Sequence, residues 1–375
     1  MSTKPLSVRL LVTAAALALA SMSNAIPVVY VNTATGNDGN AGNAPGAAVK
    51  TITKGIELVD ADGTVNVAAG SYAEQIVVGK SVKLRGANAG VSPTTGTRTA
   101  ESIITANAPV ILLQPAAASS EVDGFKFTGS ANDVDDGIIK AQSGPNNVAI
   151  ACNVFDANAS RAVNAIGVIG WYIHDNLIQN VTGNQESGMS LVTLQDSVVA
   201  YNRIVNAVYG GMIVDSTVRT LFTRNYIQNV TQAGIQVANT AGPNTLSFNT
   251  MTQTNTSNSA DKGAVTVYVN VSNLSILNND FSGNNGAVAI RNQAGTVAAT
   301  VVANQNNIVG NNGVAVKNSA QGGGTLDATN NWWGSNTGPT HASNPGGTGD
   351  AVSNNVNFTP WLQQVSSVES WATYE

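Results

Sequence analysis

A pattern of apolar and polar residues recurs along the chain from about residue 123 to residue 333. Each unit has a short apolar strand that opens on glycine or alanine, a second strand that ends on asparagine, and a bulky apolar residue two positions later. Gly234-Ile235-Gln236-Val237, Leu246-Ser247-Phe248-Asn249 and Met251 form one such unit. The asparagines recur every 23 to 30 residues: Asn153, Asn176, Asn202, Asn225, Asn249, Asn279, Asn306 and Asn330. A period in this range predicts a solenoid.

Alternation within each unit predicts which side chains are buried. Ile235 and Val237 are expected inside and Gln236 outside, and the positions equivalent to Met251 are all large and apolar: Phe155, Ile178, Ile204, Ile227 and Phe281. Since every unit runs the same way round, successive strands are expected to be parallel and about 4.8 Å apart. The asparagines then form a row at a bend, where their amides can hydrogen-bond to those above and below. This predicts a structural role for the row.

The N-terminal segment differs from the repeat. Residues 28–31 are typical of a strand, and the spacing of Ile52, Ile56 and Val59 predicts a helix within residues 51–60. Six strings in this segment resemble the N-terminal cap of bacterial right-handed parallel β-helix proteins, the pectin-lyase-like superfamily: Tyr30-Val31-Asn32, Gly36-Asn37-Asp38, Thr51-Ile52, Gly63-Thr64-Val65, Gly70-Ser71-Tyr72 and Glu74. The likeness is close over residues 28–86 and continues in the coils to about residue 333.

The resemblance implies an all-β fold, a single right-handed parallel β-helix with three sheets and about 11 coils. A short helix should cover the exposed edge of the first coil. Trp332-Trp333 and Pro360-Trp361-Leu362 are expected to form an aromatic C-terminal cap. We therefore divide the chain into a signal peptide (1–25), the N-terminal cap and first coils (26–90), the repeats (91–334) and the C-terminal cap and tail (335–375).

The first 25 residues are typical of a secretory signal. Lys4 and Arg9 precede an apolar run over residues 10–20, and Ser23-Asn24-Ala25 fits a small-x-small cleavage site. This run is too short to span a bilayer of about 30 Å. We expect an exported protein, extracellular, periplasmic or on the cell surface, with no membrane span in the mature chain.

The charge and the cysteine content argue against a nucleic-acid partner and against an internal disulfide. The formal charge is 17 − 22 = −5 and no basic cluster appears along the chain, which argues against nucleic acid as a partner. The single cysteine, Cys152, cannot form an internal disulfide. Its place among apolar residues suggests an inert core thiol.

Enzymes of the resembled superfamily that cleave acidic polysaccharides have their sites on the sheet that corresponds here to the Gly-Ile-x-Val strands, and on the loops that lead into it. We expect the outward row of this sheet to hold Ile139, Asn164, Ser190, Ile213, Gln236, Thr266, Ala289 and Ala315. This row has no acid, base or histidine. Because a lyase needs a base, the expected row disfavours catalysis on the strands themselves.

The loops before these strands carry more chemistry. Asp133, Asp135 and Asp136 offer hard oxygen ligands for Ca²⁺. Arg161, Glu186 and Tyr209 precede the equivalent strands of the next three coils, so these loops are expected to line a groove about 15 Å long. Our hypothesis assigns catalysis to Arg161 and Glu186, and substrate binding to the side chains of Asp136, Lys140 and Tyr209. A solvated polar loop with ordinary ion pairs is the alternative.

Two further features are ambiguous. His174 and Asp175 are adjacent in a strand, so their side chains should point in opposite directions, which favours a surface histidine over a catalytic pair. The insertion at residues 252–262, which contains Asp261 and Lys262, is expected to protrude beside the groove and to form a rim for a ligand.

Three functions fit these patterns. The first is binding of a polysaccharide or cell-surface glycan along one side, without strong catalysis. The second is a polysaccharide lyase or hydrolase that acts on an acidic polysaccharide with Ca²⁺. The third is a structural or adhesive surface rod. The uncharged outward row favours the first and third functions, whereas the loop residues favour the second.

Overall fold

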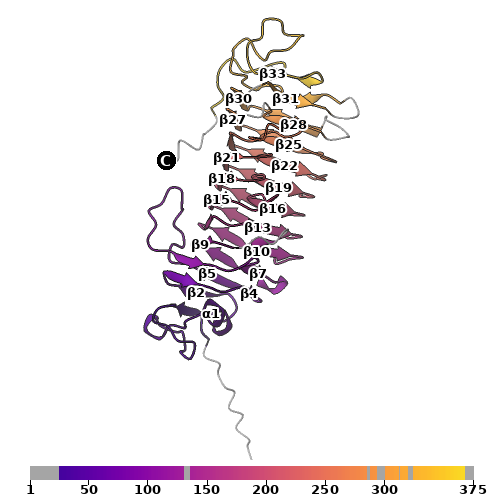
Figure 1. Cartoon of the computed structure of the whole chain (residues 1–375). Helices are drawn as coiled ribbons and strands as arrows, with labels where there is room; N and C mark the ends of the chain where they lie inside the picture. The colour runs from indigo at the N-terminus through magenta and orange to yellow at the C-terminus, as the bar shows by residue number, and fades with distance from the viewer. Residues whose placement is uncertain are drawn as a thin grey trace, which may run out of the picture.

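The computed structural model describes residues 25–130, 136–284, 288–293, 300–311, 313–319 and 324–367. These residues form one elongated right-handed parallel β-helix, with helix α1 (Ile52–Leu58) at one end (Figure 1). Two short 3-10 helices, η1 (Pro45–Ala47) and η2 (Pro115–Ala117), lie between strands. The predicted all-β solenoid is confirmed. In the part of the chain that the structure describes, the three sheets hold 13, 11 and 10 strands, and the number of coils differs slightly from the expected eleven.

Sheet A runs the whole length of the rod. Its strands, in spatial order, are β1 (Val28–Val31), β2 (Gly63–Val67), β5 (Val82–Arg85), β8 (Glu121–Asp123), β11 (Ala149–Ala151), β14 (Tyr172–His174), β17 (Val198–Ala200), β20 (Leu221–Thr223), β23 (Asn244–Ser247), β26 (Leu274–Leu277), β29 (Val301–Asn304), β32 (Leu326–Asp327) and β34 (Val356–Asn357).

Sheet B follows sheet A in each coil. It consists of β3 (Gly70–Tyr72), β6 (Ser102–Ile104), β9 (Phe125–Thr128), β12 (Val154–Asp156), β15 (Leu177–Val181), β18 (Arg203–Ala207), β21 (Tyr226–Val230), β24 (Thr250–Thr252), β27 (Asp280–Ser282) and β30 (Asn307–Val309).

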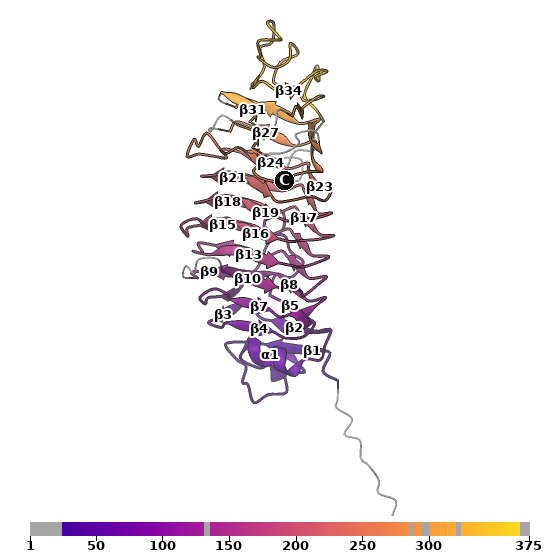
Figure 2. The same ribbon diagram turned by 90° about the vertical axis from the view of Figure 1, so that its right-hand side faces the viewer.

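Sheet C completes the coil, and it is the sheet for which sites were predicted. It consists of β4 (Ile76–Val78), β7 (Ile111–Leu113), β10 (Gly137–Gln142), β13 (Arg161–Ile166), β16 (Met189–Val192), β19 (Met212–Asp215), β22 (Ile235–Ala238), β25 (Val265–Val267), β28 (Ile290–Asn292), β31 (Val314–Asn318) and β33 (Ala351–Val352). Figure 2 shows its strands stacked in register up one side of the rod.

The core is the interior of the coils. Ile235, Val237, Leu246 and Met251 are completely buried, as the alternation predicts. The residues equivalent to Met251 are also fully or almost fully buried: Phe155, Ile178, Ile204, Ile227 and Phe281. Parallel pairing places like residues over one another, so apolar rows continue from coil to coil and bury one another.

The asparagines form a hydrogen-bonded row between sheets A and B. The side-chain Nδ2 of each asparagine donates to Oδ1 of the next at 2.9–3.1 Å, from Asn153 to Asn331. The same Nδ2 also donates to a backbone carbonyl of a neighbouring coil, as from Asn225 to Val199 at 2.9 Å. The expected last member, Asn330, is wrong: Asn331 occupies that place, and Asn330 is the residue of the bend before it.

A left-handed residue precedes each member of the row. These residues have φ between 51° and 60°: Cys152, Asp175, Tyr201, Arg224, Phe248, Asn278, Gln305 and Asn330. Left-handed backbone costs about 1–2 kcal/mol for residues other than glycine. The hydrogen bonds of the buried asparagine that follows offset this cost and turn the chain from sheet A into sheet B.

Both ends of the rod are covered. Helix α1 packs on β1, β2 and β4, and the Thr51 hydroxyl caps it by accepting a hydrogen bond from the Lys54 backbone N–H at 3.2 Å. At the other end Trp333 is completely buried, and Trp361 packs against the core while its indole N–H donates to the Asn336 carbonyl at 3.1 Å. Among the described residues, no helix is long and apolar enough to cross a membrane.

Candidate functional site

The outward row of sheet C differs from the expected one. The strand pairings align Lys140, Asn164, Ser190, Ile213, Gln236, Thr266, Arg291 and Lys317. The predicted members Ile139, Ala289 and Ala315 are wrong, because the strand pairings place Lys140, Arg291 and Lys317 in the row instead. The expected row is counted from the glycine or alanine that opens each strand. In these three coils the outward residue lies one or two positions later in the chain, and such a shift in register changes which side chains face outward. The row therefore carries three cations.

Arg161 and Glu186, the predicted catalytic residues, form a buried ion pair. Arg161 Nε donates to Glu186 Oε2 at 2.6 Å, and the two residues are only 7% and 1% exposed. Arg161 lies opposite Gly137 in the neighbouring strand, one residue beyond its predicted alignment with Asp136. The structure thus brings the two residues together, but it directs their charges at each other within the fold.

The other predicted residues lie around this pair. Lys140 and Asp136 form an ion pair four residues apart in sequence. Tyr209 lines a small hollow with Gly210, Gln232 and Gln236. Asp133 and Asp135 lie outside the described residues, so the Ca²⁺ hypothesis stays a prediction.

The insertion after β24 is a loop that internal hydrogen bonds hold in place. Asn255 is completely buried; its Nδ2 donates to the carbonyls of Ser259 and Lys262 at 2.9 and 3.1 Å, and its Oδ1 accepts from the Ser259 backbone N–H at 3.0 Å. Asp261 and Lys262 contact side chains of the outward row of sheet C. The loop therefore forms the wall of a recess on this face, and its role as a rim for a ligand stays a prediction.

This recess, which we call the cationic cavity, has a volume of about 790 Å³. It is lined by Ser259, Asp261, Lys262, Tyr268, Val269, Arg291, Gln293 and Ser319. Lys262 Nζ donates to Gln236 Oε1 at 2.6 Å and lies 5.3 Å from the centroid of the Tyr268 ring. Burial lowers the pKa of Lys262 from its usual 10.5. Sequence reasoning missed Arg291, because the pattern placed Ala289 in the outward row.

A second group of polar residues surrounds His174 on sheet A. His174 Nδ1 lies 2.8 Å from Asp175 Oδ2, and the His174 ring stacks on Tyr172 with centroids 3.8 Å apart. The expectation that the two side chains diverge is wrong, because Asp175 has left-handed backbone (φ 52°), which interrupts the alternation. Burial raises the pKa of the nearby Cys152 thiol to about 12, and the carboxylates of Asp123 and Asp175 add to this shift. A raised pKa leaves little of the nucleophilic thiolate, and Cys152 is buried at the bend between sheets A and B.

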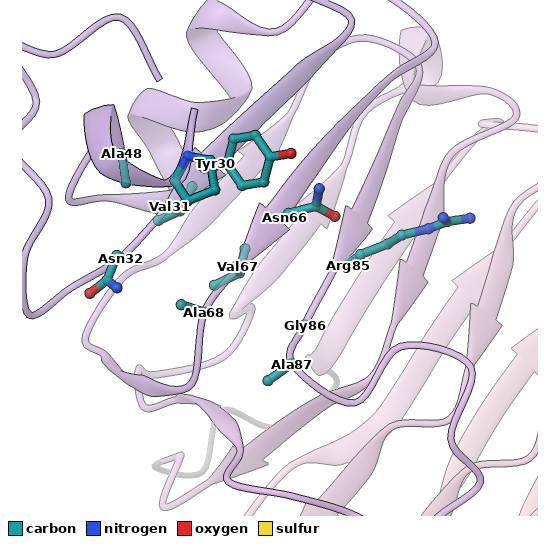
Figure 3. Close-up of a pocket in the computed structure, with 11 residues that line it drawn as sticks. Tyr30, Val31, Asn32, Ala48, Asn66, Val67, Ala68, Arg85, Gly86 and Ala87 are labelled. Carbon is teal, nitrogen blue, oxygen red and sulfur yellow. The ribbon is translucent and has the colours of Figure 1, made fainter. Parts of the chain in front are cut away.

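A smaller hollow of about 240 Å³ lies on sheet A near the N-terminal cap. Figure 3 shows the side chains of Tyr30, Asn66 and Arg85 projecting from three successive strands. Arg85 is held there by Glu121 on the next strand, with Nε 3.0 Å from Oε1. Sequence reasoning did not identify this hollow, because its residues belong to the cap and not to the repeat.

Comparison with solved structures shows the fold. The catalytic domain of a GH87 α-1,3-glucanase in complex with nigerose superposes with a TM-score of 0.53 and 15% identity, covering 90% of this chain and 68% of that chain. XylC in complex with xylose gives a TM-score of 0.48 and 11% identity, covering 75% of each chain. The periplasmic alginate epimerase AlgG gives 0.46 and 10%, covering 72% of each chain. At these identities the likeness concerns architecture alone. No curated protein matches the chain by sequence.

The sequence of the chain matches one protein-family model. The model described as "Periplasmic copper-binding protein (NosD)" matches residues 71–258, which are 188 of the 375 residues and so half of the chain. The matched range runs from within β3 into the insertion loop. The family is periplasmic, in agreement with the predicted export. The chain therefore belongs to the NosD family of periplasmic proteins.

Proposed function

We propose that this protein binds a polysaccharide along the outer face of sheet C, outside the cytoplasm and without catalysis of its own. The observation that carries the proposal is the cationic cavity, where a half-exposed tyrosine ring, amides, hydroxyls and cations meet on that face. Aromatic rings with a few convergent polar groups are typical of small-molecule sites. Coils stacked about 4.8 Å apart add a regular series of side chains along which an extended polymer can lie.

The buried ion pair supports binding over catalysis. A general base must come within hydrogen-bond reach of the proton that it removes. Glu186 is 1% exposed and accepts from Arg161 at 2.6 Å, so its carboxylate is turned toward the guanidinium and away from a substrate. The lyase or hydrolase hypothesis then depends on the carboxylates before β10, of which Asp136 is paired with Lys140.

The donors of this chain do not fit the copper site that the family's description implies. Copper is bound by imidazole and by soft sulfur ligands. The chain has two histidines and one cysteine. His174 is on β14 and His341 lies beyond β31, while Cys152 is buried with a raised pKa. Met189, Met212 and Met251 are fully or almost fully buried inside the coils. Among the described residues, no three His, Cys, Asp or Glu side chains are grouped as metal ligands.

Affinity electrophoresis against immobilised glucan, xylan, alginate, pectate and chondroitin tests the proposal. We expect retardation in at least one gel, with neither ultraviolet-absorbing unsaturated products nor new reducing ends in solution. The variant pair Gln236→Ala and Tyr268→Ala should reduce the retardation. The matched pair Gln228→Ala and Tyr226→Ala, on β21 of sheet B, should not.

Three outcomes would contradict the proposal. Product formation would establish the catalytic alternative, and an absence of retardation on every polymer would leave the structural rod. Equal losses from the sheet B and sheet C variants would contradict the choice of face.

A further inference from the structure

We infer that the cationic cavity binds an oxyanion substituent of a sugar, a carboxylate or a sulfate, with Arg291 as its principal ligand. This inference rests on the proposed function and adds the chemical class of the ligand to it.

The first argument concerns the buried guanidinium. Arg291 is 6% exposed, yet its described contacts are few and long. Nη2 donates to Asp261 Oδ1 at 3.3 Å and Nη1 to the Asn292 carbonyl at 3.4 Å, while Nε has no hydrogen-bond partner among the described residues. Hydrogen bonds between charged groups are usually shorter, about 2.7–2.9 Å. A buried charge is costly unless it is paired and hydrogen-bonded. The described contacts thus neutralise the guanidinium of Arg291 only weakly, and an oxyanion in the cavity would complete that neutralisation.

The carboxylate beside Arg291 is a weak substitute for such a ligand. The side chain of Asp261 is 70% exposed and lies on the insertion loop, so water screens much of its charge. Its backbone carbonyl accepts from Gln293 Nε2 at 3.0 Å, which anchors the loop and leaves the carboxylate at the edge of the cavity. A ligand can therefore approach Arg291 without breaking a short ion pair.

The second argument is the local charge. The charged residues that line the cavity are Lys262, Arg291 and Asp261, and Lys317 lies next to Arg291 on the following strand. Three cations and one carboxylate give 3 − 1 = +2, in a chain whose formal charge is −5. Positive potential in a recess attracts anions and raises their local concentration.

The third argument is the shape and composition of the cavity. A volume of about 790 Å³ is larger than a simple ion needs and lies within the usual range of ligand pockets, about 300–1,000 Å³. The Tyr268 residue is 45% exposed and can support a sugar ring, and Ser259 and Ser319 supply hydroxyls in the wall. The planar fork of an arginine matches the two oxygens of a carboxylate or sulfate. The cavity thus has a place for both the ring and its charged substituent.

Calorimetry on the full chain tests the inference with free acetate and sulfate and with three short oligosaccharides. One oligosaccharide carries carboxylates, the second is its neutral methyl-esterified counterpart, and the third carries sulfates. We expect at least one charged ligand to bind tenfold or more tightly than the esterified one, with an affinity that falls as salt is added. Arg291→Gln should abolish this difference, and Arg291→Lys should retain part of it. Arg219→Gln, at an exposed ion pair between sheets C and A, is the control and should leave the difference intact.

Different outcomes reject this inference and the proposed function. If the esterified ligand binds as tightly as the charged ones, the oxyanion inference fails while glycan binding stands. If free acetate or sulfate binds as tightly as any oligosaccharide and no polymer is retained, the anion site stands and the proposed function fails. Should Arg291→Gln unfold the protein, Arg291→Lys decides, because it keeps the charge and loses the fork; unchanged binding would then overturn the role of the guanidinium. Binding of none of the ligands would reject both.

Discussion

Arg161 and Arg291 are both buried arginines of sheet C, on strands five coils apart, and their surroundings are opposite. Arg161 meets a carboxylate that is itself buried, at 2.6 Å. Arg291 meets a carboxylate that is 70% exposed, at 3.3 Å, and its Nε has no partner among the described residues. The first arginine is neutralised by the fold, whereas the described contacts of the second neutralise it only weakly. An arginine in a predicted groove therefore indicates a site only when the fold has not already supplied its counter-ion.

The largest effect on stability should come from breaking the buried ion pair of Arg161 and Glu186. Glu186→Gln leaves the Arg161 charge buried without its carboxylate, and losing one partner of a buried pair costs about 3–5 kcal/mol in free energy of unfolding. Arg291→Gln should change this quantity by less than about 1 kcal/mol, because the change also removes a poorly neutralised buried charge. Urea denaturation measures both. Equal destabilisation by the two variants would remove the distinction between the regions.

A substitution in the asparagine row should destabilise the protein by an intermediate amount. Asn225→Leu removes hydrogen bonds to Asn249 and to the Val199 carbonyl, and each buried group left unpaired costs about 1–3 kcal/mol. Gln228→Leu, on the solvent side of the same coil, makes the same change of side-chain type and should have little effect. A comparable loss of thermal stability in both variants would argue against a structural role for the row.

Lys262 in the cationic cavity should make the stability of the protein depend on pH in the alkaline range. Burial lowers its pKa, so between that lowered value and 10.5 the unfolded chain binds a proton that the folded chain has released. The free energy of unfolding therefore increases as the pH rises through this range. Lys262→Met should flatten the profile in thermal melts. Lys83→Met, at an exposed lysine of β5, is the control, and an equal flattening there would contradict the assignment to Lys262.

The smallest effect is expected at the exposed pair of Asp196 and Arg219. The two side chains are 48% and 53% exposed, with Arg219 Nη2 2.8 Å from Asp196 Oδ2. The hydrogen bond from Arg219 lowers the pKa of Asp196. Because solvent screens exposed pairs, Asp196→Asn should leave the melting temperature unchanged within error at neutral pH. A clear fall would mean that burial is not what separates Arg161 from the other arginines.

The architecture was predictable because it depends on repetition. The spacing of the asparagines and the apolar positions such as Ile235 and Met251 recur often enough to define the coil, the core and the row of amides. The site was less predictable, because its residues lie where the repeat is irregular. At Lys140 and Arg291 a shift of one or two residues reassigns the outward face, and the local pattern does not contain that shift. It is decided by pairing with the neighbouring strands.

The sequence by itself determined the solenoid, its parallel strands, its capped N-terminus and the burial of its apolar rows, since these follow from short-range periodicity summed over many coils. Only the tertiary structure decided which charges are neutralised. Arg161 and Glu186 are 25 residues apart, Asp261 and Arg291 are 30 apart, and the quality of each contact depends on side-chain burial and loop position across coils. For that reason the predicted groove and the cationic cavity look alike in sequence and differ in how far their arginines are neutralised.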